Sequence, residues 1–233
     1  MSEIITVKDL SKIYIAGENR IKALDHVSFT VEEGSFVAVI GTSGSGKSTL
    51  LNMLAGLEPP TEGSIVIAGE HIDGLDEAGL IEFRREHVGF VFQSYNLLPH
   101  MNGLENASMP LTIRGWEKAE REARAMEYLK MVGVEKEAYH MPDQMSGGQQ
   151  QRVGIARAFV TEPQIIFADE PTGNLDSNTT REVLKLMKRM VEEKHTTLVM
   201  VTHDNNLAAC CDVRIRIIDG HVTDIEYGAA DIE

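Results

Sequence analysis

The sequence lacks long apolar runs and a leader-like N-terminus, and both absences exclude a class of protein. No apolar stretch approaches the roughly 18 residues that a helix needs to cross a bilayer. The first residues, Met1–Ile4, have neither the basic start nor the apolar segment of a signal peptide. We therefore expect a chain that stays in the cytosol and does not itself span a membrane.

Basic residues and cysteines are also scarce. The 22 Lys and Arg stand against 36 Asp and Glu, which gives a net charge of −14. Phosphate backbones repel such a surface, so the balance argues against a general nucleic-acid binder, while a local basic groove stays open. The only cysteines, Cys210 and Cys211, are adjacent. Because a disulfide between neighbours is strained, we predict small, buried or half-buried residues in a reducing compartment rather than a metal or redox site.

Short apolar segments alternate with turns along the chain and predict an α/β protein, with an antiparallel β region in the first forty residues. Between 96 and 159 the pattern changes to Pro and Asn residues followed by apolar residues at helical spacing, and we expect an inserted helical subdomain there. The remaining segments, 1–95 and 160–228, form the core of a single domain, followed by a disordered tail at 229–233. The expected strands are 4–9, 26–31, 36–40, 64–67, 88–92, 164–168, 197–201, 213–218 and 221–225, and the expected helices are 50–55, 117–132, 149–160 and 177–194.

A glycine-rich stretch between an apolar strand and a helix has the context of a phosphate-binding loop. Its glycines let successive N–H groups point at an anion, above the positive end of the following helix. Lys47 supplies a charge between the β- and γ-phosphates, and the Ser48 hydroxyl is a ligand for Mg²⁺. The alternative is a Ser/Gly-rich turn with an incidental lysine. The candidate nucleotide-binding residues are Gly41, Thr42, Ser43, Gly44, Ser45, Gly46, Lys47, Ser48 and Thr49.

Two acids, Asp169 and Glu170, end a later apolar strand. A strand buried in the sheet core delivers such carboxylates to its C-terminal edge, where α/β sheets bind ligands. Asp169 is placed to hold Mg²⁺, directly or through water, and Glu170 to act as general base on the attacking water. A pair of solvated acids at a strand end is the simpler alternative.

A second glycine-rich stretch, Ser146-Gly147-Gly148-Gln149, directly precedes a helix. Its N–H groups and the helix dipole predict another anion site. Because Ser is a good N-cap, an ordinary capped helix start is the alternative.

At this point the chain resembles the nucleotide-binding subunit of ATP-binding-cassette (ABC) transporters, from about Ile4 to Val222. The ordered motifs that carry the resemblance are the loop Gly41–Ser48, Gln93, Ser146–Gln149, Asp169-Glu170, Asn174–Asp176 and His203. The segments 92–99 and 169–176 are similar to the branch of lipoprotein-release, macrolide-efflux, septum-associated and peptide-antibiotic-resistance ATPases (LolD-, MacB- and FtsE-like).

The resemblance implies a P-loop NTPase fold with a RecA-like core and an ATPase that uses ATP and Mg²⁺. It implies that Tyr14 stacks on adenine, that Gln93 senses the γ-phosphate and metal and touches the permease, and that His203 contacts the γ-phosphate. It also places Asp176 among the nucleotide-binding residues. As ordinary alternatives, Tyr14 is a strand aromatic, Gln93 a surface amide and His203 a structural histidine near a helix start.

The resemblance further implies a head-to-tail dimer with ATP between the loop 41–49 of one copy and Ser146–Gln149 of the other. A separate transmembrane permease is the expected partner, and nucleic acid is not, so the chain is expected to lie peripherally on the inner face of the membrane. Met145, where the family more often has Leu, and the turn 16–19 beyond Tyr14 are departures from the pattern.

The rival interpretations are a soluble cassette ATPase acting on DNA or ribosomes and a force-transmitting complex at the septum. Gln93 and Ser146 lie too close in sequence for an intervening long coiled coil, and each motif occurs once, which argues against the first. Sequence does not separate the second from export.

Overall fold

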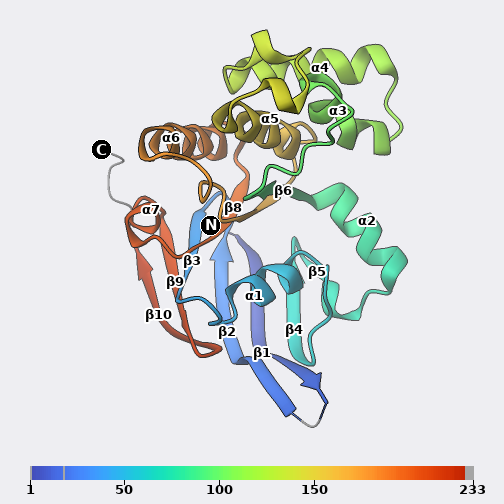
Figure 1. Ribbon diagram of the computed structural model, residues 1–233. Helices are drawn as coiled ribbons and strands as arrows, with labels where there is room; N and C mark the ends of the chain where they lie inside the picture. Colours follow the sequence, from blue (N-terminus) through green and yellow to red (C-terminus); the bar gives the residue numbers. More distant parts are fainter. Residues whose placement is uncertain (1, 18, 229–233) are drawn as a thin grey trace. The chain divides into compact units, whose positions relative to one another are not determined.

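The computed structural model describes residues 2–17 and 19–228, so Glu18 of the predicted turn and the predicted tail 229–233 lie outside the described residues. The contacts divide the chain into two units (Figure 1). The first unit contains the chain up to His87 together with the segment from Thr197 onward, and the second is Val88–Thr196.

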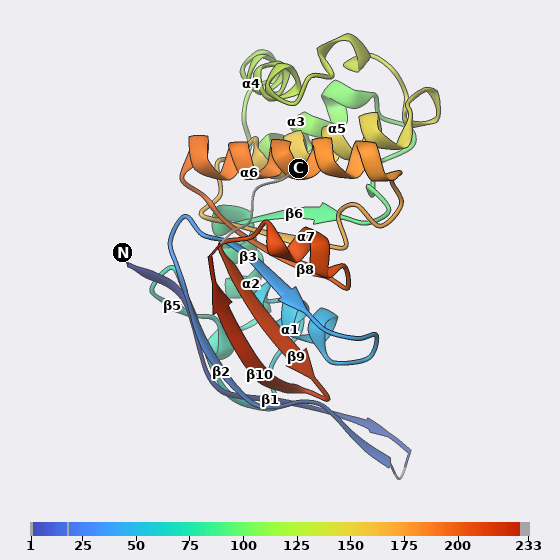
Figure 2. The same ribbon diagram turned by 90° about the vertical axis from the view of Figure 1, so that its left-hand side faces the viewer.

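An antiparallel sheet of the first unit has the strand order β2-β1-β4-β5. Its two long strands form a hairpin whose end projects beyond the other strands (Figure 2). The expected strands 4–9 and 26–31 are therefore only the inner parts of β1 and β2. Backbone pairing continues past register shifts to Ala16 and Asn19, but the apolar side chains of the outer part, such as Ile15 and Ile21, are exposed, so no buried alternation in the sequence marks it. The strands are β1 (Glu3–Ala16), β2 (Asn19–Glu32), β4 (Glu62–Ile67) and β5 (Glu70–His71).

A second group of strands in this unit carries the phosphate loop. β3 (Phe36–Ile40) is buried at every position and pairs in parallel with β8 (Thr197–Thr202) and β9 (Val213–Ile218). β10 (His221–Tyr227) closes the group as the antiparallel partner of β9. The expectation that residues 36–40 extend the antiparallel region is wrong: five consecutive buried apolar residues suit a parallel strand covered on both faces.

The helices of the first unit are short. They are α1 (Lys47–Leu54), α2 (Glu77–His87) and α7 (Asn205–Ala209), with a single turn, η1, at Ile72–Gly74. Among the residues of α2, only Phe83 is buried. A helix with so small an apolar face leaves little periodic signal, and the sequence analysis did not predict it.

The second unit combines two parallel strands with four helices, which Figure 1 shows gathered together. α3 was missed because Pro110 lies inside it. A capping box between Asn102 and Glu105 fixes its start, and the buried Leu104 and Leu111 anchor it despite the lost hydrogen bond. The elements are β6 (Val88–Phe92), α3 (Gly103–Ile113), α4 (Lys118–Met131), η2 (Glu135–Glu137), η3 (Pro142–Gln144), α5 (Gly147–Phe159), β7 (Ile165–Asp169) and α6 (Ser177–Lys194).

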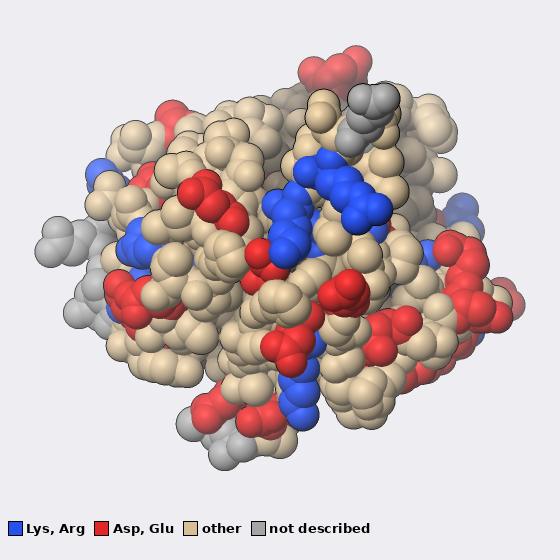
Figure 3. All heavy atoms as spheres, turned by 90° about the horizontal axis from the view of Figure 1, so that it is seen from below, with Lys and Arg blue, Asp and Glu red and all other residues tan. Residues whose placement is uncertain are grey.

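The surface carries charged side chains of both signs. Acidic and basic side chains are interspersed on the face shown in Figure 3. None of the helices in the described part of the chain is both long and apolar enough for a membrane span. Cys210 and Cys211 are buried and unbridged, as predicted.

Candidate nucleotide site

The loop 41–49 joins the buried strand β3 to α1, as the sequence predicts. Gly44 and Gly46 have φ angles of 80° and 105°, in the left-handed region that glycine adopts without steric cost. A Cβ on Gly46 would lie 2.4 Å from the carbonyl oxygen of Ala23. The first glycine, Gly41, is equally confined, since a Cβ there would lie 2.2 Å from the carbonyl oxygen of Ile217. The backbone conformation and the close contacts of the loop therefore require glycine at these positions.

Lys47 folds back over the loop. Its side chain is only 7% exposed, and its ammonium donates at 2.8 Å to the carbonyl oxygens of both Gly41 and Thr42. An ammonium has three protons, so one donor remains for a further acceptor. The Ser45 hydroxyl is buried without a partner among the described residues, while the Ser48 hydroxyl belongs to an exposed residue. A cation, two hydroxyls and a curled backbone thus share one short loop.

Tyr14 and Thr49, predicted from separate motifs, lie together. The phenol of Tyr14 donates to Oε2 of Glu58 at 2.8 Å and is hydrogen-bonded to the Thr49 side chain. Partial burial, helped by the Glu58 carboxylate, raises the pKa of Tyr14 despite the opposing bond from Thr49. The ammonium of Lys12 lies 5.4 Å from the ring centroid. The aromatic ring is thereby held beside the first turn of α1.

His203 follows β8 directly and is exposed. The next residue, Asp204, caps α7 by accepting from the backbone N–H of Asn206 at 2.8 Å. His203 therefore precedes a helix cap without being the cap itself, and its ring lies in the same unit as the phosphate loop.

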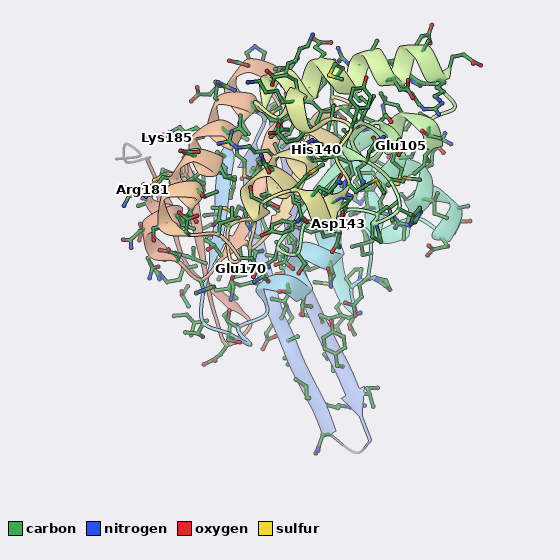
Figure 4. All side chains as sticks on the ribbon, turned by 45° about the horizontal axis from the view of Figure 1, so that its top comes forward. Glu105, His140, Asp143, Glu170, Arg181 and Lys185 are labelled. Atoms are coloured by element: carbon green, nitrogen blue, oxygen red, sulfur yellow. The ribbon has the colours of Figure 1, made fainter. Side chains whose placement is uncertain are left out.

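The acid pair lies at the C-terminal end of β7 in the second unit, where Figure 4 labels Glu170. Asp169 and Glu170 are both partly exposed. Glu170 has a φ of 44°, which is rare for a residue with a side chain and costs free energy. Its carbonyl accepts from Gly173 at 3.0 Å, and the buried amide of Gln151 donates to the carbonyl of Pro171 at 2.5 Å. The turn after β7 is thus held from both sides.

The stretch 146–149 forms the capped helix start that was one of its two sequence interpretations. Ser146 caps α5 by accepting from Gln149 N–H at 3.3 Å, and the Gln149 side chain accepts from Ser146 N–H at 2.8 Å. The same residues line a cavity of about 320 Å³ with Asp176, which itself caps α6. Hydrogen bonds from the Thr179 hydroxyl and backbone N–H groups lower the pKa of Asp176. Arg152, not singled out from sequence, also lines this cavity and pairs with Glu182 at 2.8 Å.

Gln93 is exposed and follows β6. Its carbonyl accepts from the Asn174 side chain at 3.0 Å, and a Cβ on Gly173 would lie 2.8 Å from its Nε2 atom. Gln93 therefore lies against the turn that carries Glu170.

Comparison with known proteins agrees with this arrangement of motifs. The sequence profile of the ABC transporter family matches residues 24–173. The chain belongs to this family. An uncharacterized ABC transporter ATP-binding protein of Thermotoga maritima is 47% identical over 228 residues, which cover 97% of this chain and 96% of that protein. The lipoprotein-releasing system ATP-binding protein LolD of Syntrophotalea carbinolica is 44% identical over 220 residues, covering 94% and 97%.

Two further similarities bear on architecture. The macrolide export ATP-binding/permease protein MacB of Photorhabdus laumondii is 45% identical over 222 residues, which cover 95% of this chain but 34% of that protein. The ATP-binding cassette MJ0796 of Methanocaldococcus jannaschii, solved as a dimer in a post-hydrolysis state with ADP and Pi, has a TM-score of 0.89 and 43% identity, covering 97% of this chain and 100% of that one.

These findings confirm the predicted family, its P-loop NTPase fold and its lipoprotein-release and macrolide-export relatives. The chain is an ATP-hydrolysing domain of this family, and the alternative of a soluble ATPase that acts on DNA or ribosomes is not favoured. Sequence reasoning assigned no role to two buried polar residues of α5, Gln151 and Arg157. Their signal is a polar side chain inside a helix whose neighbouring positions are apolar.

Proposed function

We propose that this ABC ATPase powers a separate membrane permease in an export or lipoprotein-release complex. ATP phosphates bind to the backbone N–H groups of the loop 41–49, with Lys47 between the β- and γ-phosphates. Adenine stacks on Tyr14. Both assignments are supported within the first unit by the left-handed glycines, the nearly buried ammonium, and the bond that holds Tyr14 beside Thr49.

Mg²⁺ fits the donor set of this chain. The hydroxyl of Ser48, the carboxylate of Asp169 and the amide oxygen of Gln93 are all oxygen donors, the kind that Mg²⁺ prefers alongside phosphates and water. No group of three His, Cys, Asp or Glu side chains suited to a metal occurs within residues 2–17 and 19–228. When bound, the ion neutralises charge on the phosphates.

Hydrolysis is assigned to Glu170 as general base and to His203 as a contact of the γ-phosphate, with Gln93 sensing that phosphate. The observation that carries the assignment of Glu170 is its left-handed backbone, since such strain at a non-glycine residue is retained where function or surrounding contacts require it. The role of the carboxylate is to accept the proton of the attacking water.

Two copies of the chain are proposed to meet head to tail. The cavity formed by Ser146–Gln149 and Asp176 presents backbone N–H groups at a helix start and is open to an anion from another molecule. The second copy thereby completes the binding site of the ATP that is bound to the first. The dimeric MJ0796 cassette supports this arrangement.

The permease partner and membrane-peripheral location rest on the relatives. MacB, by name, is an ATP-binding and permease protein in one chain, and this chain matches 34% of its length. We place the chain on the inner face of the membrane through such a permease, with no nucleic-acid partner.

The decisive test uses Glu170→Gln, which keeps the size of the side chain but removes the base. ATP binding should persist, steady-state turnover should nearly vanish, and light scattering should show a dimer only with ATP and Mg²⁺. Glu193→Gln, an exposed substitution on α6, is the matched control and should behave as the unaltered protein.

Two results would contradict the proposal. Turnover at the unaltered rate in Glu170→Gln would remove Glu170 from the chemistry. Bound ATP without any dimer would show that the cavity at Ser146–Gln149 does not receive nucleotide from a second copy.

A further inference from the structure

One face of α5 contacts the turns that follow β6 and β7. Gly147, Gln151, Gly154 and Arg157 recur every three or four residues and so share that face. A Cβ on Gly147 would lie 2.6 Å from the Tyr95 hydroxyl, and one on Gly154 would lie 3.6 Å from the Tyr95 carbonyl oxygen. The missing side chain of Gly147 thus makes room for Tyr95, while Gly154 is simply in contact with the same residue.

Arg157 holds that turn directly. Its guanidinium donates to the carbonyl oxygen of Asn96 at 2.6 Å and to that of Tyr95 at 2.8 Å. The guanidinium carbon also lies 5.9 Å from the ring centroid of Phe92, the last residue of β6. The planar guanidinium therefore contacts the chain on both sides of Gln93 and Ser94.

The backbone of the turn that Arg157 contacts is strained. Tyr95 and Asn96 have φ angles of 61° and 48°, and two consecutive left-handed residues with side chains cost free energy that other contacts must offset. Arg157 is 7% exposed, and burial lowers its pKa although an arginine stays charged. A buried cation that satisfies two carbonyl groups is well suited to stabilise this turn.

On the opposite side, Gln93 is held by the turn after β7, through the 3.0 Å bond from Asn174 to its carbonyl. The same α5 face reaches that turn through the bond from Gln151 to Pro171. The backbone of Gln93 is therefore fixed between α5 and the residues that follow Glu170.

We propose that Arg157 is a positioning residue for catalysis: it locks the Tyr95–Asn96 turn onto α5 and thereby sets the side chain of Gln93. α5 begins at Ser146–Gln149, so Arg157 also ties the position of Gln93 to the helix that carries this loop. The inference rests on the proposed role of Gln93.

The test is a double-mutant cycle in steady-state ATP hydrolysis by the full chain, with Gln93→Ala, Arg157→Met and the double variant. Gln93→Ala should lower kcat roughly 10- to 100-fold, as misplaced catalytic groups do. Arg157→Met should lower kcat within the same range and leave the KM for ATP within about threefold, because the phosphate loop is untouched. The double variant should be no slower than Gln93→Ala alone.

Two further variants separate positioning from folding. Arg157→Lys keeps the cation and one or two of the hydrogen bonds to the carbonyl groups, so it should recover part of kcat. If Arg157→Met fails to fold, a double-mutant cycle of Arg157→Lys with Gln93→Ala replaces it. Arg189→Met removes another arginine-to-carbonyl bond of the second unit, 2.7 Å to Met131, and should leave kcat unchanged.

Multiplicative losses in the double variant, or unaltered kcat in Arg157→Met, would overturn the inference while leaving the role of Gln93 intact. Unaltered kcat in Gln93→Ala would instead reject the proposed role of Gln93, and the inference with it.

Discussion

The hydroxyl of Tyr128 on α4 donates to Oε1 of Glu162 at 2.8 Å, in the turn between α5 and β7. Arg124 pairs with the same carboxylate at 2.8 Å and Lys194, the last residue of α6, at 3.1 Å. Both cations lie 5.0 Å from the Tyr128 ring centroid. A fully buried ring and one carboxylate thus join three segments of the second unit.

Tyr128→Phe should destabilise the protein by about 1 kcal/mol, less than the roughly 1.5–3 kcal/mol of a buried hydrogen bond to a charged group, because the Glu162 side chain is half exposed. The ring and its cation contacts remain, so only the hydroxyl is lost. Urea unfolding followed by circular dichroism measures the change. Tyr139→Phe, at a residue that is 70% exposed, is the control and should have no effect. Equal stability of the two variants would contradict the importance of this bond.

The same cluster predicts a pH dependence. Burial raises the pKa of Glu162, but bonds from Tyr128 and Lys194 and the charge of Arg124 outweigh it, and the net pKa is lowered. The stabilisation is then fully present above the ordinary Glu pKa of about 4.3 and is lost as the pH falls through the lowered value. Glu162→Gln should melt below the unaltered protein at pH 7, and the difference should shrink below about pH 4. A difference that is constant with pH would argue against ionisation as its cause.

Gly46→Ala should both destabilise the chain and weaken ATP binding. Its left-handed φ alone costs alanine about 1–2 kcal/mol, and the Ala23 carbonyl leaves no room for a Cβ. Gly34→Ala, also left-handed at φ 78° but with no atom within 4 Å, separates backbone strain from crowding. Thermal melting and nucleotide titration of both variants should show the larger losses for Gly46→Ala. A smaller loss there would mean that the loop can relax around the methyl group.

Ser146→Asp, made in the Glu170→Gln protein, distinguishes a helix cap from a nucleotide contact. Aspartate caps as well as serine, so α5 should stay stable, yet its charge repels the γ-phosphate of ATP bound to the second copy. Light scattering should show monomers that still bind ATP. Ser146→Asn caps without charge and should preserve the dimer. An ATP-dependent dimer of Ser146→Asp would place the phosphate elsewhere.

The family and the helix and strand boundaries with strong periodicity follow from the sequence. α6 begins at Ser177 and ends at Lys194 as predicted, because six buried apolar positions recur at helical spacing behind the Asp176 cap. β6 matches its predicted range for a similar reason: it is a short apolar run bounded by a polar residue. Of the two interpretations of Ser146, the capped helix start is confirmed, and the anion site stays a prediction that the neighbouring cavity leaves room for.

The misses have a common cause. α3 was hidden by Pro110 and α2 by its few buried positions, since neither local propensity nor periodicity registers packing against distant segments. The allocation of residues 36–40 to a parallel group depended on β8 and β9, which lie more than 150 residues further along the chain.

Candidate sites whose functional groups are adjacent in sequence could therefore be predicted from the sequence alone. The loop 41–49, the stretch 146–149 and the acid pair are the examples. Only tertiary structure decided which distant groups meet, as when Arg157 reaches the carbonyls of Tyr95 and Asn96, and Tyr14 reaches Thr49. The physical reason is range. Propensity, capping and glycine conformation act over a few residues, whereas a hydrogen bond across the fold exists only after burial has brought its partners together.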